Sequence, residues 1–264
     1  MLIQTTEFAA IQSLIIGGII ILLFSGISIL LLKRNLNRLS ISLSLYFIFS
    51  AFGLLVNFLY RLLELLDVLQ FSNPNHVTIF SILNLTTLYF TTIAGVHLLN
   101  FNLILVYSSK IFSRKKQIVT SVLYGIILLG IFVFGFLSFD IGGEQVQGIS
   151  WNVHPSPSQS SIVPYYNIYL GLYFLLTSQI VFLVIIYFSI IITKKMGKNK
   201  YSKKYIRNII GILLFDLQII GAFIANTFGS SVLARNIGLW FQIIFTIPGA
   251  LFLAFGLRKE PENA

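Results

Sequence analysis

The chain has 264 residues, of which 56% are hydrophobic and only 10% are charged. Because a soluble domain carries about 25% charged residues, this composition excludes a water-soluble fold, and the 25 phenylalanines exclude a disordered chain. The net charge is +10, and the chain contains no cysteine, which excludes disulfides, thiolate nucleophiles and cysteine-based metal sites. We therefore predict an integral membrane protein.

Seven apolar runs are long enough to cross a bilayer, whose core of about 30 Å requires about 20 residues of helix. They lie at 9–32, 39–60, 77–107, 118–139, 165–193, 208–228 and 236–257. The first run is expected to be retained, because Glu7 precedes it without any basic residue, and Lys33 and Arg34 follow it. The sequence thus predicts an all-α membrane protein in which residues 1–264 form a single seven-transmembrane helix bundle.

The basic residues are distributed unevenly around these runs. All but two of the 18 lysines and arginines fall in the first, third and fifth loops and the C-terminal tail, whereas Arg61 and Arg235 lie on the other side. By the positive-inside rule, the N-terminus is outside and the C-terminus is cytoplasmic. Because the basic residues form short clusters between apolar runs, we interpret them as a topological signal and expect the lipid bilayer, not nucleic acid, as the partner.

The longest predicted loop, 140–164, lies on the outer side and is rich in glycine, proline and serine. This composition favours turns over helix. We consider two interpretations of it: a lid over a pocket that opens outward, or an ordinary flexible loop.

Polar side chains inside a bilayer are costly and usually face the interior of a bundle, so they are the candidate ligand-binding residues. The third predicted helix is the richest in them. At 100° per residue, one stripe of this helix contains Asn84, Thr87, Thr91, Gly95 and Asn102. The opposite side contains Thr86, Tyr89, His97 and Asn100. Because neither face suits lipid, we expect this helix to be central, with neighbours on most sides.

Asp216 is the only acidic residue well inside a predicted span, and its depth differs from that of His97 by about 6 Å. We consider a buried His97–Asp216 pair that senses protons or contacts a ligand, against separate structural contacts for the two side chains. Gln179 and Gln242 are further candidates for the ligand-binding interior, or for hydrogen bonds between helices. Pro248 is predicted to bend the last helix and is a candidate hinge.

The fifth loop carries a dense basic patch on the cytoplasmic side. Its basic residues between 194 and 207 are Lys194, Lys195, Lys198, Lys200, Lys203, Lys204 and Arg207. Such a patch binds anionic lipid headgroups with about 1 kcal/mol per basic residue. We expect it to set the orientation and bind these headgroups, or to dock an acidic cytoplasmic signalling partner.

The sequence lacks the signatures of several other classes. No Ser-His-Asp set, phosphate-binding glycine loop or dinucleotide fingerprint stands out. Only His97 among the histidines lies in a predicted span, which leaves too few ligands for an intramembrane metal site. The seventh helix contains no lysine, so a retinal Schiff base is excluded. We therefore predict a protein without enzymatic activity, metal or cofactor.

The topology, the short basic inner loops and the terminal segment Gly256-Leu257-Arg258-Lys259 resemble the seven-helix sensor regions fused to prokaryotic histidine kinases and cyclases. The resemblance covers most of the chain without a specific motif, and it departs where no kinase or cyclase follows. It implies a sensor or receptor-like protein that binds a small or lipidic ligand from the outer side and signals through the basic loop. The alternatives are a small transporter or channel with a three-plus-one-plus-three helix plan, and a scaffold subunit of a membrane complex.

Overall fold

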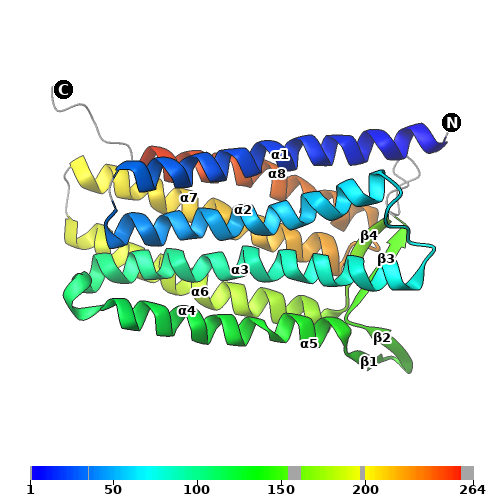
Figure 1. Cartoon of the computed structure of the whole chain (residues 1–264). Coiled ribbons are helices and arrows are strands. Elements are labelled where there is room, and N and C mark those ends of the chain that lie inside the picture. The colour runs from blue at the N-terminus through cyan, green and yellow to red at the C-terminus, as the bar shows by residue number, and fades with distance from the viewer. Residues whose placement is uncertain (1, 35, 154–161, 197–199, 257–264) are drawn as a thin grey trace.

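The computed structural model describes residues 2–34, 36–153, 162–196 and 200–256. These residues form eight helices that lie side by side in a bundle (Figure 1): α1 (Leu2–Arg34), α2 (Arg38–Leu65), α3 (Pro74–Ile111), α4 (Arg114–Leu128), α5 (Gly130–Phe136), α6 (Ile168–Met196), α7 (Lys200–Thr227) and α8 (Val232–Gly256). α4 and α5 follow one another directly, since Leu129 caps the end of one and the start of the other.

The helices have the length and composition expected of a helical membrane protein. Among the described residues, five segments are long and apolar enough to cross a bilayer: Arg38–Leu65, Pro74–Ser108, Arg114–Phe136, Ile168–Lys195 and Tyr205–Thr227. Shorter apolar stretches lie in the described parts of α1 and α8, at Gly17–Lys33 and Ile244–Leu253. Large apolar side chains also point outward, such as Leu22 and Ile180 at 74% and 63% exposure. An apolar surface of this kind is expected to face lipid.

Polar residues cap the helices where the chain turns back. The Asn37 side chain accepts a hydrogen bond from the backbone N–H of Ser40 at 2.8 Å, at the start of α2. The Asn73 side chain does the same for the N–H of Asn75 at 3.0 Å, and Pro74 occupies the first turn of α3. Such side chains satisfy backbone donors that have no partner within the helix.

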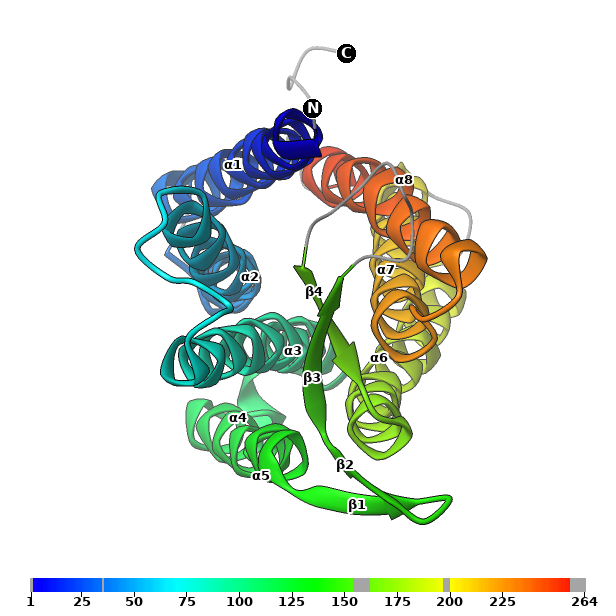
Figure 2. The ribbon, with the colours of Figure 1, turned by 90° about the vertical axis from the view of Figure 1, so that its right-hand side faces the viewer.

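Six helices form a ring in the order α1, α2, α3, α6, α7 and α8, and contacts between α1 and α8 close it (Figure 2). α4 and α5 lie outside this ring, where α4 packs on α3 and α5 packs on both α3 and α6. α3 therefore contacts α2, α4, α5 and α6, as the polar residues on its two faces predicted.

Glycines bring two helix pairs of the ring into backbone contact. A Cβ at Gly53 would lie 2.7 Å from Thr91 Cγ2, so a side chain there would push α2 from α3. A Cβ at Gly238 of α8 would lie 2.5 Å from the backbone of both Ala225 and Gly221 in α7. Close approach through small residues is the usual way in which membrane helices gain packing contacts.

Two antiparallel β-ribbons follow α5. β1 (Ser138–Ile141) pairs with β2 (Glu144–Gln147), and β3 (Ile149–Val153) pairs with β4 (Ile162–Tyr166). Gly142 and Gly143, with φ of 66° and 88°, form the tight turn between β1 and β2. Positive φ at both central residues is typical of the turn that suits a two-stranded ribbon.

These ribbons correct two predicted helix boundaries and the predicted loop. The helix expected at 118–139 ends earlier, because α5 ends at Phe136 and β1 follows. The helix expected at 165–193 begins later, because Tyr165 and Tyr166 belong to β4. The outer segment 140–164 is therefore largely strand where it is described, although its glycines and prolines favoured turns alone.

The two ends of the bundle differ in charge. The ribbon end, which carries β1 to β4, also holds Glu64, Asp67, Asp140 and Glu144. The opposite end, called the basic end below, carries the exposed side chains of Lys33, Arg38, Lys110, Arg114, Lys115, Lys116, Lys194, Lys195 and Arg207. α1 begins at the ribbon end, and α8 ends at the basic end (Figure 1).

Candidate functional site

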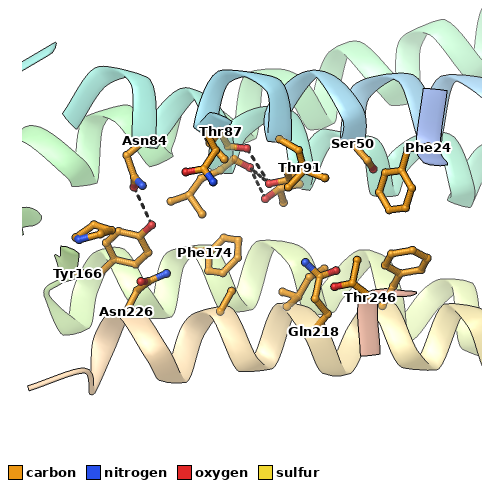
Figure 3. Close-up of a pocket in the computed structure, with 18 of the residues that line it drawn as sticks. Phe24, Ser50, Asn84, Thr87, Thr91, Tyr166, Phe174, Gln218, Asn226 and Thr246 are labelled. Carbon is orange, nitrogen blue, oxygen red and sulfur yellow. Dashed lines mark hydrogen bonds between the residues drawn. The ribbon is translucent and has the colours of Figure 1, made fainter. Parts of the chain in front are cut away.

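A cavity of about 270 Å³ lies inside the ring, with α2 and α3 on one side and α6, α7 and α8 on the other (Figure 3). Its size is close to the lower end of the range for small-molecule sites, about 300–1,000 Å³. The polar lining residues are Tyr46, Ser50, Asn57, Tyr60, Arg61, Asn84, Thr87, Thr91, Thr92, Tyr166, Gln218, Asn226 and Thr246. Phenylalanines from α1, α6 and α7 supply much of the apolar wall.

Strand β4 covers the cavity at the ribbon end, where Pro164 and Tyr166 belong to its lining. The Tyr166 hydroxyl donates to Asn84 Oδ1 at 2.8 Å, and Asn84 Nδ2 donates to the Tyr60 hydroxyl at 3.2 Å. The Tyr165 hydroxyl donates to the Gly229 carbonyl oxygen at 2.8 Å, beyond the end of α7. The β3–β4 ribbon is thereby tied to α2, α3 and the turn between α7 and α8.

Trp151 of β3 fixes the ribbon from the other side. Its indole Nε1 donates to Ser81 Oγ of α3 at 2.9 Å. Its ring packs against Phe71, Phe80 and Tyr60, with ring centres 5.2, 5.7 and 6.3 Å away. Such aromatic contacts contribute about 0.5–1.5 kcal/mol per pair beyond the buried area. The ribbon is therefore a packed part of the fold, and not a free loop above it.

Aromatic rings line the other end of the cavity. Phe24 packs edge to face on Phe47 and Phe215, with ring centres 5.5 and 5.8 Å apart. Tyr46 packs in the same way on Phe47 and Phe215, at 5.1 and 5.7 Å. These four residues are called the aromatic floor below: Phe24, Tyr46 and Phe215 line the cavity on the side of the basic end, and Phe47 packs against Phe24 and Tyr46.

The threonine row, defined as Thr87, Thr91 and Thr92 of α3, lines the middle of the cavity. Each hydroxyl donates to the carbonyl oxygen four residues earlier, at 3.1, 2.8 and 2.6 Å respectively. Gln218 of α7 lies across the cavity from Thr91 (Figure 3). Within the described part of the chain, its side-chain amide has no hydrogen-bond partner.

Arg61 is the only formally charged residue among the described lining residues, and it lies at the ribbon end of the cavity. Its Nη1 is 2.7 Å from Glu64 Oε2, and its guanidinium carbon is 5.2 Å from the Tyr60 ring centre. Because the carboxylate neutralises the guanidinium, the mouth of the cavity carries no net charge.

The predicted ligand-binding residues are divided between the cavity and other places. Asn84, Thr87 and Thr91 line the cavity together, as their common stripe suggested. Asn100 lies on another face of α3, where its Nδ2 donates to Ser121 Oγ of α4 at 3.0 Å. Its contact is therefore one between helices.

The hypothesised His97–Asp216 pair is wrong. His97 stacks on Phe49 of α2, with ring centres 4.9 Å apart. Asp216 Oδ1 accepts a hydrogen bond from Gln179 Nε2 at 2.6 Å, which joins α6 to α7. Similar depth does not bring the two residues together, because α6 lies between α3 and α7 in the ring. None of the three residues lines the cavity.

The remaining predicted residues lie near the basic end or outside the described part. Lys194, Lys195 and Arg207 are exposed, whereas Lys198 and the side chains of Gln242, Lys200, Lys203 and Lys204 lie outside the described residues. Pro248 lies within α8, which continues through it to Gly256. Its role as a hinge stays a prediction.

Several lining residues were missed as site residues. Asn57 follows Ser50 by seven positions, and Gln218 precedes Ala222 by four, so each pair shares one face of its helix. A search for polar stripes on the second and sixth predicted helices would have found these amides. Tyr166 gave no such signal, because it reaches the cavity through a strand pairing that the sequence did not predict.

The arrangement is suited to binding through hydrogen bonds and ring contacts. Its described lining contains no acidic side chain, and the described residues hold no group of three or more His, Cys, Asp or Glu placed to bind a metal ion. No protein-family model matches the sequence, and no curated protein matches it. The proposal of a function therefore rests on the geometry and chemistry of the cavity.

Proposed function

We propose that the protein is a seven-pass membrane receptor or sensor, with its N-terminus outside, that binds a small ligand in the cavity between α2, α3, α6, α7 and α8. The observation that carries this proposal is the cavity, which β4 covers at the ribbon end and which rings of the aromatic floor line on the other side. A binding pocket needs a single entrance, whereas a transport path must reach both faces of the membrane.

The charges at the two ends support the orientation. Exposed lysines and arginines gather at the basic end, and Glu64, Asp67, Asp140 and Glu144 lie at the ribbon end. Because positively charged loops remain in the cytoplasm, the ribbon end faces outward. A ligand then approaches from outside, past the β3–β4 ribbon.

α7 offers a route from the cavity to the basic loop. Phe215 and Gln218 of this helix line the cavity, and its described residues begin at Lys200, within the basic segment 194–207. Near that start, the Tyr205 hydroxyl donates to Asn102 Oδ1 of α3 at 2.5 Å. A ligand that displaces α7 would change this contact and the presentation of the basic loop to anionic lipid headgroups or an acidic partner.

The proposal is tested by screening small molecules against the protein in lipid nanodiscs, with the melting temperature as readout. Ala222→Phe fills the cavity from α7, and Leu213→Phe adds a ring on the exposed side of the same helix as a matched control. We expect compounds that raise the melting temperature of the wild type and of Leu213→Phe, and that leave Ala222→Phe unchanged.

Two results would contradict the proposal. One is a set of stabilising compounds that act equally on Ala222→Phe, which would place binding elsewhere. The other is passage of such a compound across proteoliposomes that depends on the protein and stops in Ala222→Phe, which would indicate a transporter.

A further inference from the structure

We infer that the ligand of this cavity is an uncharged molecule with a flat apolar body, which donates hydrogen bonds to the threonine row and accepts one from Gln218. The inference rests on the proposed binding function and names the chemical class of its ligand. A primary aromatic amide is the simplest group that meets these requirements.

The charge of the lining disfavours a charged ligand. No acidic side chain lines the described cavity, so a buried ammonium group would have no counter-ion. The one guanidinium, that of Arg61, already lies 2.7 Å from the Glu64 carboxylate. A buried carboxylate would therefore have to compete with Glu64 for this cation. Burying an unpaired charge is unfavourable by far more than burying a neutral polar group.

The threonine row determines which groups the ligand presents to α3. A hydroxyl has one proton and two lone pairs. The protons of Thr87, Thr91 and Thr92 are directed at backbone carbonyl oxygens of α3 at 2.6–3.1 Å. Only their lone pairs remain, so the threonine row can accept hydrogen bonds but not donate them, and it suits a ligand with N–H or O–H groups.

Gln218 supplies the complementary group on the opposite wall. Its amide faces the cavity across from Thr91 and has no partner in the described part of the chain (Figure 3). Its N–H groups can donate to an acceptor on the ligand, and its Oε1 can accept from a donor. A primary amide satisfies both walls, because its nitrogen donates two hydrogen bonds and its oxygen accepts.

The apolar part of the ligand is set by the rings around it. Phe174 and Phe182 of α6 and the floor residues Phe24 and Phe215 line the cavity. The floor residues already pack edge to face on one another. A flat ring adds to such a cluster with the same geometry, and a volume of about 270 Å³ has room for one ring with its polar group.

The first test compares benzamide, benzoate and benzylammonium, which share a ring and differ in charge. Their binding to the protein in nanodiscs is measured by saturation-transfer NMR titration, with Ala222→Phe as the control for the cavity. We expect benzamide to bind at least about tenfold more tightly than either ion. Equal or tighter binding of benzoate or benzylammonium overturns the inference, and so does the absence of benzamide binding.

A substitution and its matched control test the hydrogen bond between the ligand and the threonine row. Thr91→Val removes one acceptor with little change in shape, and we expect benzamide affinity to fall about threefold to tenfold. Thr177→Val is the matched control, because Thr177 also donates to the backbone of its own helix, at 2.7 Å, but does not line the cavity. An equal loss in both variants, or no loss in Thr91→Val, contradicts the role of the threonine row.

Glu64→Gln tests the neutrality of the mouth. Without the carboxylate, the positive charge of Arg61 is no longer neutralised by Glu64, so we expect benzoate affinity to rise several-fold while benzamide affinity changes less. Unchanged benzoate binding contradicts the argument from charge. These outcomes are separable from the proposed function, since a charged compound that binds the wild type but not Ala222→Phe refutes the ligand class and leaves the receptor proposal intact.

Discussion

The half of the bundle next to the ribbon end (the ribbon half) and the half next to the basic end (the basic half) contain similar polar side chains. In the two halves these side chains have different partners. In the ribbon half, Asn84, the threonine row and Gln218 surround a cavity. In the basic half, Asn102 Oδ1 accepts from both Ser189 Oγ at 3.1 Å and the Tyr205 hydroxyl at 2.5 Å. There the side chains of α3, α6 and α7 bond to one another directly, although Asn100 Oδ1 and Asn208 Oδ1 have no hydrogen-bond partner among the described residues.

This difference shows under which condition a polar residue inside a helical span indicates a ligand-binding site. Residue type alone does not indicate a ligand-binding site, because α3 contributes an asparagine to each half of the bundle. What matters is whether the hydrogen-bonding capacity of the side chain is used by its neighbours. Gln179 is bonded to Asp216 at 2.6 Å, whereas the amide of Gln218 has no partner in the described chain.

The largest expected contrast comes from enlarging one alanine in each half. Ala250 of α8 is fully buried in the packed basic half, so Ala250→Phe should lower the free energy of unfolding by about 3 kcal/mol. Ala222→Phe enters the cavity and should change it by less than about 1 kcal/mol. Unfolding in mixed micelles measures both values, and equal losses would mean that the two halves are packed alike.

A smaller contrast is expected from removing one asparagine in each half. Asn102→Leu leaves Ser189 and Tyr205 without their shared acceptor and should cost about 2 kcal/mol. Asn84→Leu should cost about 0.5 kcal/mol, because the cavity can admit water to the hydroxyls of Tyr60 and Tyr166. The same unfolding assay applies, and a greater loss for Asn84→Leu would reverse the comparison.

The smallest expected change in stability comes from loosening the β3–β4 ribbon, which covers the cavity. Trp151→Phe removes the hydrogen bond to Ser81 but keeps an aromatic ring against Phe71 and Phe80. The loss of stability should be about 1 kcal/mol, and amide hydrogen exchange should become faster in β3 and β4 while it stays unchanged around Tyr205. Faster exchange at both ends would mean that the ribbon is not an independent cover.

The sequence predicted the helical architecture well because long apolar runs carry a strong signal. It also grouped Asn84, Thr87 and Thr91, which line the cavity together, since positions three and four apart on one helix share a face whatever surrounds it. The same stripe included Asn102, which instead bonds to Ser189 and Tyr205 near the basic end. Both predictions use information contained within a single helix.

The errors concern relations between helices. Residue counting placed His97 and Asp216 at similar depth, but the order of helices around the ring decides which side chains meet, and α6 separates the two. The β-ribbons were missed because strands this short carry little periodicity. Their contribution to the cavity, through Pro164 and Tyr166, depends on pairing with β3 across the outer segment.

The proposal that the cavity opens to the outside of the cell is tested most directly by single-cysteine labelling. The chain contains no cysteine, so each variant carries one reactive thiol. Gln145→Cys lies on exposed β2 at the ribbon end, and Lys115→Cys lies at the exposed start of α4 at the basic end. With a membrane-impermeant maleimide, Gln145→Cys should be labelled on intact cells and Lys115→Cys only after permeabilisation. The reverse pattern would place the ribbon end in the cytoplasm and contradict the proposed receptor.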